Sequence, residues 1–415
     1  MLRLGQTDFS GSIPTEIGML TNMREIVFSK AGFVGGIPTE IGQLSELFML
    51  LLDENSLSGT IPSEVGNLVN MKTFHVDNNK LISGTIPSEY GNMSFLESLK
   101  LHGNQLNGTV PTEIYALNDL VEVYLGYQAL TGTLSTEIGL MGQVVLFHMV
   151  ETNVSGTLPT ELGNLTDCKW LSLNHNNFTG SIPTEIGFMK SLESITVEVR
   201  SCRVGHESFA FDHSRALVFS INLQGNLLTS TIPSEIGLLT TLQRIDVDVN
   251  SLTGRIPTET GLLTSLTRLD FDDNYLTGNI PSELGNLKSI ENLFLYRNSL
   301  NGTLPTTLAQ LSSTLVELNF HGNDLTGTVP TEYAALSRLQ EIYLQDTMLT
   351  GNVSDSFCAG GSSSSSSSKK NRKFDSFFMD CLEQEQDGDQ QSSYEIVCPC
   401  CTFCCNGNGS ICEYV

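Results

Sequence analysis

The chain has 415 residues, of which 40% are hydrophobic, and a net charge of −25 at pH 7. This acidic balance argues against nucleic acid as a partner, since nucleic-acid binding needs a basic footprint, and it disfavours docking on anionic membrane surfaces. No apolar run reaches the roughly 18 residues that a membrane-spanning helix needs. Because G-x-S-x-G, H-E-x-x-H and P-loop motifs are also missing, we expect neither enzymatic activity nor a cofactor.

The N-terminal residues Met1-Leu-Arg-Leu open in the middle of a sequence repeat. Neither a signal peptide nor a polar N-terminal cap precedes them, and a solenoid needs such a cap at each end. We therefore expect a fragment of a longer protein.

An Ile-Pro or similar dipeptide returns about every 24 residues along most of the chain, which indicates a solenoid. We count about 15 repeats in residues 1–357, and the pattern is degenerate around residues 198–220. The prolines that share this frame are Pro14, Pro38, Pro62, Pro87, Pro111, Pro159, Pro183, Pro233, Pro257, Pro281, Pro305 and Pro330.

A clear copy of the repeat runs from Leu242 to Pro257 and follows the pattern L-x-x-L-x-L-x-x-N-x-L. Its L-x-L part alternates and predicts a short strand, and the proline that follows favours a helical turn. The asparagine can satisfy backbone groups where the chain leaves the strand. Repeats with Thr, Ala, Gln or Arg at this position, and the one in which Asn79 is displaced by one residue, are expected to turn more loosely. The asparagine is kept at Asn55, Asn104, Asn176, Asn226, Asn250, Asn274, Asn298 and Asn323.

The consensus L-t-G-x-I-P-x-e-i-G-x-L resembles the plant-type leucine-rich repeat of receptor-like kinases, receptor-like proteins and polygalacturonase-inhibiting proteins. The resemblance covers about residues 1–357. It implies an α/β solenoid, a right-handed superhelix with a parallel β-sheet on its concave face and short 3-10 turns on its convex side.

Residues 198–220 lose the consensus and are locally basic. One interpretation is a ligand-contacting loop, as some receptors with this repeat use, and the other is a decayed repeat. The spacing of Pro183 and Pro233, 50 residues by their numbers, fits two repeats and favours a decayed repeat.

Residues 358–415 hold eight of the chain's 10 cysteines and are expected to form a disulfide-rich C-terminal cap. Their pairing cannot be read from the sequence. Residues 360–373, rich in serine, predict a flexible loop within the cap. Cys401-Thr-Phe-Cys404 has the spacing of a zinc knuckle, but no second pair follows, so disulfides are favoured. The tail is similar to tails of algal leucine-rich repeat proteins. The disulfide candidates are Cys358, Cys381, Cys398, Cys400, Cys401, Cys404, Cys405 and Cys412.

Eight N-x-S/T sequons agree with the cysteines on an oxidising, extracellular or cell-surface location. Several of them arise because the repeat itself contains such a triplet. The glycosylation candidates are Asn92, Asn107, Asn153, Asn164, Asn177, Asn301, Asn352 and Asn408.

Strand alternation predicts which side chains point outward from the concave sheet, and two groups stand out. The first holds histidines and tyrosines, which are common recognition elements and would make binding sensitive to pH between about 5 and 7. Zinc binding would need two or three of its histidine rings to converge. Its members are His75, His102, Tyr124, Tyr127, His148 and His175.

The second group is acidic and is flanked by rings. Aspartates on adjacent strands, about 4.8 Å apart, repel one another unless a cation or a basic ligand lies between them. A well-hydrated acidic face is one interpretation. The alternative is a site for a basic peptide or a calcium-bridged polysaccharide, with calcium as the candidate metal at Asp246, Asp248, Asp270 and Asp272. The group consists of Asp246, Asp248, Asp270, Asp272, Asp273, Phe294 and Tyr296.

These features predict an extracellular or cell-surface recognition module that binds a peptide, protein or polysaccharide ligand on its concave face. It could be the ectodomain part of a receptor. A structural or adhesive matrix protein and an inhibitor of a secreted wall-degrading enzyme are the alternatives.

Overall fold

The computed structural model describes residues 1–5, 11–192, 220–352, 376–380, 396–397, 403–405 and 412–414. These residues form two compact units, Met1–Leu227 and Leu228–Val415. The predicted division at residue 357 stays a prediction. Most of the degenerate stretch 198–220 and all of the serine-rich segment 360–373 lie outside the described residues. No described helix is long and apolar enough to cross a membrane.

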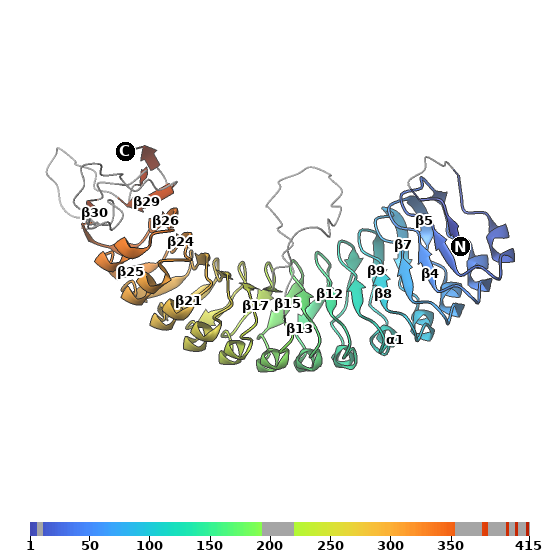
Figure 1. The fold of residues 1–415 in the computed structure, drawn as a ribbon, viewed down its shortest axis with the longest axis horizontal. Coiled ribbons are helices and arrows are strands. Elements are labelled where there is room, and N and C mark those ends of the chain that lie inside the picture. Colours follow the sequence, from blue (N-terminus) through green and yellow to red (C-terminus); the bar gives the residue numbers. More distant parts are fainter. Residues whose placement is uncertain are drawn as a thin grey trace. The chain divides into compact units, whose positions relative to one another are not determined.

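In the first unit each repeat contributes one strand to a parallel sheet, which we call the strand face (Figure 1). The register advances by one repeat per strand up to β14, as in Glu122↔Leu146 and Leu146↔Trp170. The next pairing, Leu171↔Ile221, joins β14 directly to β16, so the described part of the sheet has no strand of its own for the predicted decayed repeat between them. Its strands are β1 (Leu2–Arg3), β2 (Glu25–Val27), β4 (Met49–Leu51), β6 (Thr73–His75), β8 (Ser98–Lys100), β10 (Glu122–Tyr124), β12 (Leu146–His148), β14 (Trp170–Ser172) and β16 (Ser220–Asn222).

A second row of short parallel strands comes from the L-x-G-x segment of the repeats. In the first unit these strands are β3 (Val34–Gly35), β5 (Ser56–Thr60), β7 (Leu81–Thr85), β9 (Gln105–Gly108), β11 (Ala129–Leu130), β13 (Ser155–Thr157) and β15 (Asn177–Gly180), and β17 (Leu227–Leu228) lies where the two units divide.

Short helical turns follow the prolines, and in η5 a serine, Ser135, because the residue before each turn is extended and its carbonyl accepts the N–H three residues later, as Pro14 does from Ile17 at 3.1 Å. The predicted 3-10 turns are therefore confirmed, with one α-helical exception. In the first unit they are η1 (Thr15–Met19), η2 (Thr39–Gln43), η3 (Ser63–Asn67), η4 (Ser88–Asn92), α1 (Thr112–Tyr115), η5 (Thr136–Leu140), η6 (Thr160–Asn164) and η7 (Thr184–Phe188).

The second unit repeats this plan, with strand-face strands, second-row strands and turns. Its strand-face strands are β18 (Arg244–Asp246), β20 (Arg268–Asp270), β22 (Asn292–Phe294), β24 (Glu317–Asn319), β26 (Glu341–Tyr343), β29 (Ser376–Asp380), β31 (Phe403–Cys405) and β32 (Cys412–Tyr414). Its other short strands are β19 (Thr253–Gly254), β21 (Tyr275–Asn279), β23 (Ser299–Gly302), β25 (Asp324–Gly327), β27 (Met348–Leu349), β28 (Gly351–Asn352) and β30 (Ile396–Val397). Its helical turns are η8 (Ser234–Leu238), η9 (Thr258–Leu262), η10 (Ser282–Asn286), η11 (Thr306–Leu311) and η12 (Thr331–Ala335).

The C-terminal tail continues the strand face of this unit. β29 and β31 add two parallel strands, and β32 then pairs with β31 in the antiparallel sense. The disulfides predicted for the tail stay a prediction, since Cys358, Cys381, Cys398, Cys400 and Cys401 lie outside the described residues.

Glycine lets successive turns pack closely. A Cβ on Gly261 in η9 would lie 2.3 Å from the backbone oxygen of Glu283 in the next repeat, nearer than real Cβ atoms come.

The apolar residues of the repeat lie between the strands and these turns, and Leu269, Phe271 and Leu276 are fully buried. Burial of such side chains against neighbouring repeats drives the stacking.

The repeat asparagines hydrogen-bond adjacent repeats together, which confirms their predicted role. Asn274 donates from Nδ2 to the carbonyls of Val247, at 3.0 Å, and Asp272, at 2.9 Å. Its Oδ1 accepts the N–H of Leu252, also in the preceding repeat, at 2.9 Å. We call this arrangement the asparagine ladder; its members are Asn55, Asn79, Asn104, Asn176, Asn226, Asn250, Asn274, Asn298 and Asn323.

The expectation of a looser turn at the displaced Asn79 was wrong. This side chain donates to the carbonyls of Leu52 and Val76, both at 3.0 Å, and accepts the N–H of Leu57 at 3.0 Å. The additional residue of this repeat therefore lies after the asparagine and leaves the ladder intact.

Loss of one ladder asparagine should destabilise the second unit. Asn274→Ala leaves buried carbonyl and N–H groups without partners, so we expect a loss of about 2–3 kcal/mol in the free energy of unfolding. Urea unfolding followed by circular dichroism would measure it. The control is Asn286→Ala, at an exposed position in η10; equal losses in both variants would contradict the role of the ladder.

The residue before the ladder position has a left-handed backbone in the second unit's repeats as in the first. Val249 (φ 50°), Asp273 (φ 46°) and Arg297 (φ 48°) show it, and Gly322 (φ 65°) supplies the residue that favours it. A β-branched residue is strained there, because the left-handed region brings Cβ close to the following carbonyl.

Val249→Asn should therefore stabilise the protein by about 1 kcal/mol, since asparagine tolerates this conformation and the Val249 side chain is 49% exposed. The midpoint of urea unfolding should rise. Val69→Asn, at a similarly exposed position (48%) without positive φ, is the control and should give no gain.

Candidate functional site

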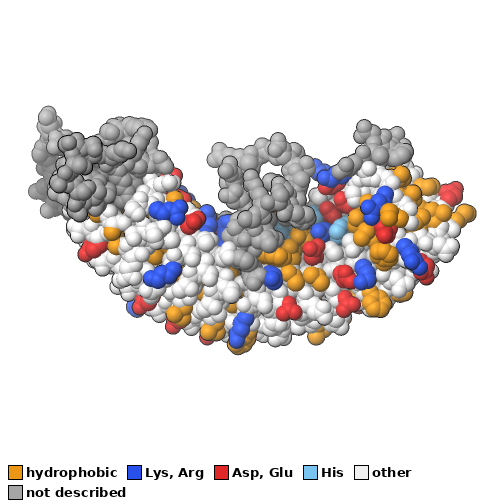
Figure 2. Space-filling model, viewed as in Figure 1, with side chains coloured by type: hydrophobic (Ala, Val, Ile, Leu, Met, Phe, Trp, Pro, Cys, Tyr) orange, Lys and Arg blue, Asp and Glu red, His pale blue; other side chains and the backbone are white. Residues whose placement is uncertain are grey.

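Within each unit, the strand register confirms that the side chains predicted to point outward from the sheet lie on one face. In the first unit Lys100 pairs with His75 and Tyr124, and Tyr124 pairs with His148. In the second unit Asp270 pairs with Asp246. On the strand side of the first unit, histidine side chains lie beside acidic and basic ones (Figure 2).

Four side chains of the first unit form a continuous set of rings, which we call the ring group: His102, Tyr124, Tyr127 and His148. The Tyr124 ring centroid lies 5.5 Å from those of both His102 and His148, and Tyr127 lies 5.9 Å from His148. The Lys100 ammonium lies 4.7 Å from the centre of the Tyr124 ring, a cation–π contact. Stacked strands hold the rings in this order.

The other two predicted histidines lie apart from these contacts. The His75 Nε2 atom is 2.9 Å from the Ser98 hydroxyl. His175 is exposed, and its ring packs against Gly225. A Cβ atom added to Gly225 would lie 2.5 Å from the Nδ1 atom of His175. Among the described residues, the group of three or more side chains that could hold a metal ion consists of aspartates. The described histidines form no such group, which a zinc site with three histidine ligands would need.

The rings are less exposed than the sequence predicted. His102 and Tyr124 are 5% exposed and His148 is 6% exposed. Burial lowers the pKa of His75 and His102 to about 3 and that of His148 to about 4. These three imidazoles are therefore neutral between pH 5 and 7, and the predicted pH sensitivity does not come from them.

In the first unit, Asp77 titrates near neutral pH. Its carboxylate lies 3.6 Å from the His102 Nε2 atom and is largely buried. Burial, followed by the charge of Asp53, raises its pKa to about 7. Sequence reasoning missed Asp77 because it placed the titrating chemistry on the histidines.

A pH titration should reveal this aspartate. Its folded pKa is raised above the unfolded value of about 3.9, so its contribution favours folding below pH 4 and is lost as pH rises through about 7. Relative to the wild type, Asp77→Asn should therefore gain about 2–4 kcal/mol of stability between pH 4 and pH 7. Urea unfolding at several pH values would measure it. Asp324→Asn, at an exposed site, is the control, and a parallel pH dependence in wild type and Asp77→Asn would contradict the assignment.

The second unit carries the acidic residues, which we call the aspartate group: Asp246, Asp248, Asp270, Asp272 and Asp273. Asp246 and Asp270 end strands β18 and β20, and Asp248 and Asp272 follow two residues later on the same side. Contrary to the expected hydrated face, the first four are buried: Asp246 is 3%, Asp248 7%, Asp270 4% and Asp272 1% exposed.

Arginines offset part of this charge, and sequence reasoning missed two of them, Arg244 and Arg268. Arg244 lies 3.0 Å from Asp246 and Arg268 lies 2.6 Å from Asp270, both through Nη2 to Oδ2. The more exposed Arg297 lies 3.5 Å from Asp273. The sequence does indicate the contacts of Arg244 and Arg268. R-x-D-x-D occurs in both repeats, and period-two alternation puts the arginine and the two aspartates of each segment on one face.

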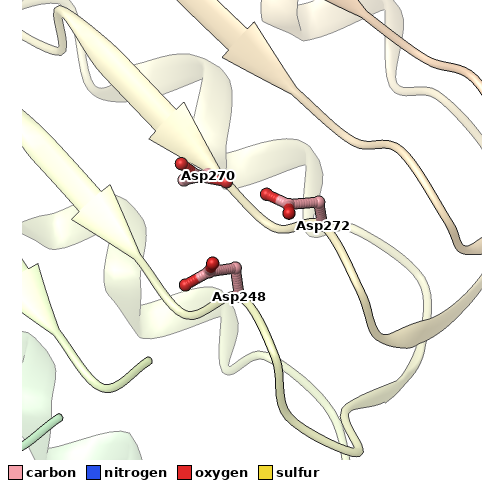
Figure 3. A group of neighbouring side chains, drawn as sticks. All are labelled: Asp248, Asp270 and Asp272. Atoms are coloured by element: carbon pink, nitrogen blue, oxygen red, sulfur yellow. The ribbon is translucent and has the colours of Figure 1, made fainter. Parts of the chain in front are cut away.

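Asp248, Asp270 and Asp272 converge (Figure 3). Each offers one carboxylate oxygen such that all three lie within 4.8 Å of one another. Two unit charges at that distance repel by about 3 kcal/mol at an effective dielectric constant of about 20. Burial and the charge of Asp246 raise the pKa of Asp270 above its usual range, against the opposing effect of Arg268.

Rings flank the aspartate group as predicted. The guanidinium of Arg268 lies 4.5 Å from the centre of the Phe294 ring. Tyr296 stacks on His321, with ring centroids 4.7 Å apart and an interplanar angle of 10°. Both rings of this pair are half-buried and so leave surface for a ligand.

Among the sequons, the six with described side chains are exposed. Asn107 in β9 and Asn301 in β23 lie on the second row of strands, away from the strand face. The side chain of Asn352 and all of Asn408 lie outside the description. Glycosylation stays a prediction.

The family model described as Leucine Rich Repeat matches residues 167–189 and 265–287. No curated protein sequence matches the chain. Among solved structures, a TDR receptor is similar over 87% of this chain and 58% of its own, with 26% identity and a TM-score of 0.75.

Two ectodomains of plant receptor kinases from Arabidopsis are also similar. That of HAESA, in complex with an N-terminal extended IDA peptide hormone ligand, has 28% identity and a TM-score of 0.70, covering 85% of this chain and 55% of that one. That of GASSHO1/SCHENGEN3, in complex with CASPARIAN STRIP INTEGRITY FACTOR 2, has 28% identity and a TM-score of 0.61, covering 86% and 45%.

The chain carries leucine-rich repeats and has the α/β solenoid fold of the plant receptor ectodomains to which it is similar. It spans roughly half the length of the solved ectodomains named above.

Proposed function

We propose that the chain is an extracellular recognition module that binds an extended peptide, of neutral or basic composition, on its strand face. The observation that carries this proposal is the row of rings and charges that the strand register aligns, one side chain per repeat. The similar structures include receptor ectodomains, among them that of HAESA in complex with a peptide hormone ligand.

The chemistry of the face supports a peptide. A row of side chains spaced by the strand separation of about 4.8 Å can contact successive residues of an extended chain laid across the strands. Half-buried rings such as Tyr127 and Tyr296 offer large contact areas at low entropic cost, and tyrosine is enriched at binding hot spots. The net charge of −25 favours basic over acidic ligands.

The proposal extends to the place of this chain in a longer protein. Ectodomains similar to it are longer than this chain, so we propose that it is part of a secreted or cell-surface protein of the receptor type. Matrix adhesion and inhibition of a wall-degrading enzyme are the alternatives, and a glycan array or retention of such an enzyme would reveal them.

An array of synthetic linear peptides of graded net charge tests the proposal. The chain should retain neutral and basic peptides, and Tyr296→Ala should weaken their binding about 30-fold, as expected of a hot-spot ring worth about 2 kcal/mol. Tyr275→Ala is the matched control, since Tyr275 is a 62% exposed tyrosine on the second row of strands of the same unit.

Retention of glycans with no peptide bound would overturn the proposal. So would equal losses in the Tyr296 and Tyr275 variants, because the ligand would then lie away from the strand face.

A further inference from the structure

Asp272 is a buried carboxylate without a hydrogen-bond donor. Asp272 is 1% exposed, and neither its Oδ1 nor its Oδ2 atom has a hydrogen-bond partner among the described residues. Figure 3 shows its carboxylate turned towards Asp270 and Asp248. A buried polar group normally has a partner, so this arrangement indicates that something binds between the three residues.

The charge of the surroundings indicates what that partner is. The aspartate group brings five carboxylates, and Arg244, Arg268 and Arg297 bring three positive charges. Among these described residues, with all groups ionised, the balance is two negative charges, which one divalent cation would neutralise. Arg268 already occupies Oδ2 of Asp270, while Oδ1 of Asp270 has no hydrogen-bond partner.

We propose that Asp248, Asp270 and Asp272 bind a calcium ion. Calcium takes carboxylate oxygens at 2.3–2.6 Å and tolerates irregular geometry, with water completing its shell. Two oxygens bound to one calcium ion can be up to about 4.8 Å apart, twice a bond length of about 2.4 Å. The three oxygens lie within 4.8 Å of one another, so small side-chain rotations would bring all of them to one ion. Magnesium, with bonds of about 2.0–2.1 Å, spans only about 4.2 Å.

The site goes beyond the proposed peptide recognition and does not depend on it. A bound ion would fix the turns after β18 and β20, which carry Asp248 and Asp272, beside the half-buried Tyr296. Tyr296 also supplies a probe. Burial and the charges of Asp270, Asp273 and Asp248 raise its pKa to about 12, which reflects its closeness to the aspartates.

Terbium, which replaces calcium at oxygen sites, tests the proposal on the full chain. Excitation of tyrosine should produce sensitised terbium emission, and calcium should displace the ion with a midpoint between micromolar and about millimolar. Asp272→Asn should weaken terbium binding by about 100-fold, and Asp248→Asn serves as a second variant. The control Asp324→Asn removes the same charge from an exposed position of the same unit and should bind terbium as the wild type does.

Thermal unfolding with calcium and with chelator gives a second readout. Calcium should raise the Tm of the wild type and of Asp324→Asn, while Asp272→Asn should lose this shift and be more stable than the wild type in chelator, because a buried charge is removed. No sensitised emission, or the same calcium response in Asp272→Asn as in the wild type, would overturn the proposal. Peptide retention on the same array is also measured in chelator. If peptides are retained there while terbium does not bind, the calcium proposal fails and the recognition proposal stands.

Discussion

The hydrogen bonds of the asparagine ladder are the constraint on which the rest of the structure depends. Each repeat is too short to satisfy the backbone where its strand ends, and the amide of the next asparagine supplies both a donor and an acceptor there, as Asn274 does for Val247 and Leu252. Leaving such groups unpaired costs about 1–3 kcal/mol each. Stacking of apolar side chains drives the repeats together, but these directional bonds fix their spacing and register.

Fixed register gives the strand face its chemistry. Because each strand pairs with the next without slipping, side chains from successive repeats lie directly beside one another, ring on ring in the first unit and aspartate on aspartate in the second. Such close packing removes water from side chains that a single strand would leave exposed. This explains why His75, His102 and His148 are neutral and why the pKa of Asp77 is raised, since burial disfavours the charged form of each.

Several parts of this arrangement were predictable from residues alone. The proline period gave the helical turns, and L-x-L alternation gave the outward column that contains Tyr124, His148, Asp246 and Asp270. The arginines of the R-x-D-x-D segments were equally readable from period two but were overlooked. The intact ladder at Asn79 was also readable but overlooked, because Phe74 and Val76 precede Asn79 at the same spacing at which Leu269 and Phe271 precede Asn274.

The sequence by itself determined the solenoid, its strand face and the acidic character of its second unit, because these follow from a periodic pattern that needs only neighbouring repeats to be satisfied. Tertiary structure alone decided how deeply that face is buried, which group titrates near neutral pH, and that Asp248, Asp270 and Asp272 converge on one point. Burial and convergence depend on side-chain directions in two or more repeats at once, and a linear pattern does not specify those directions.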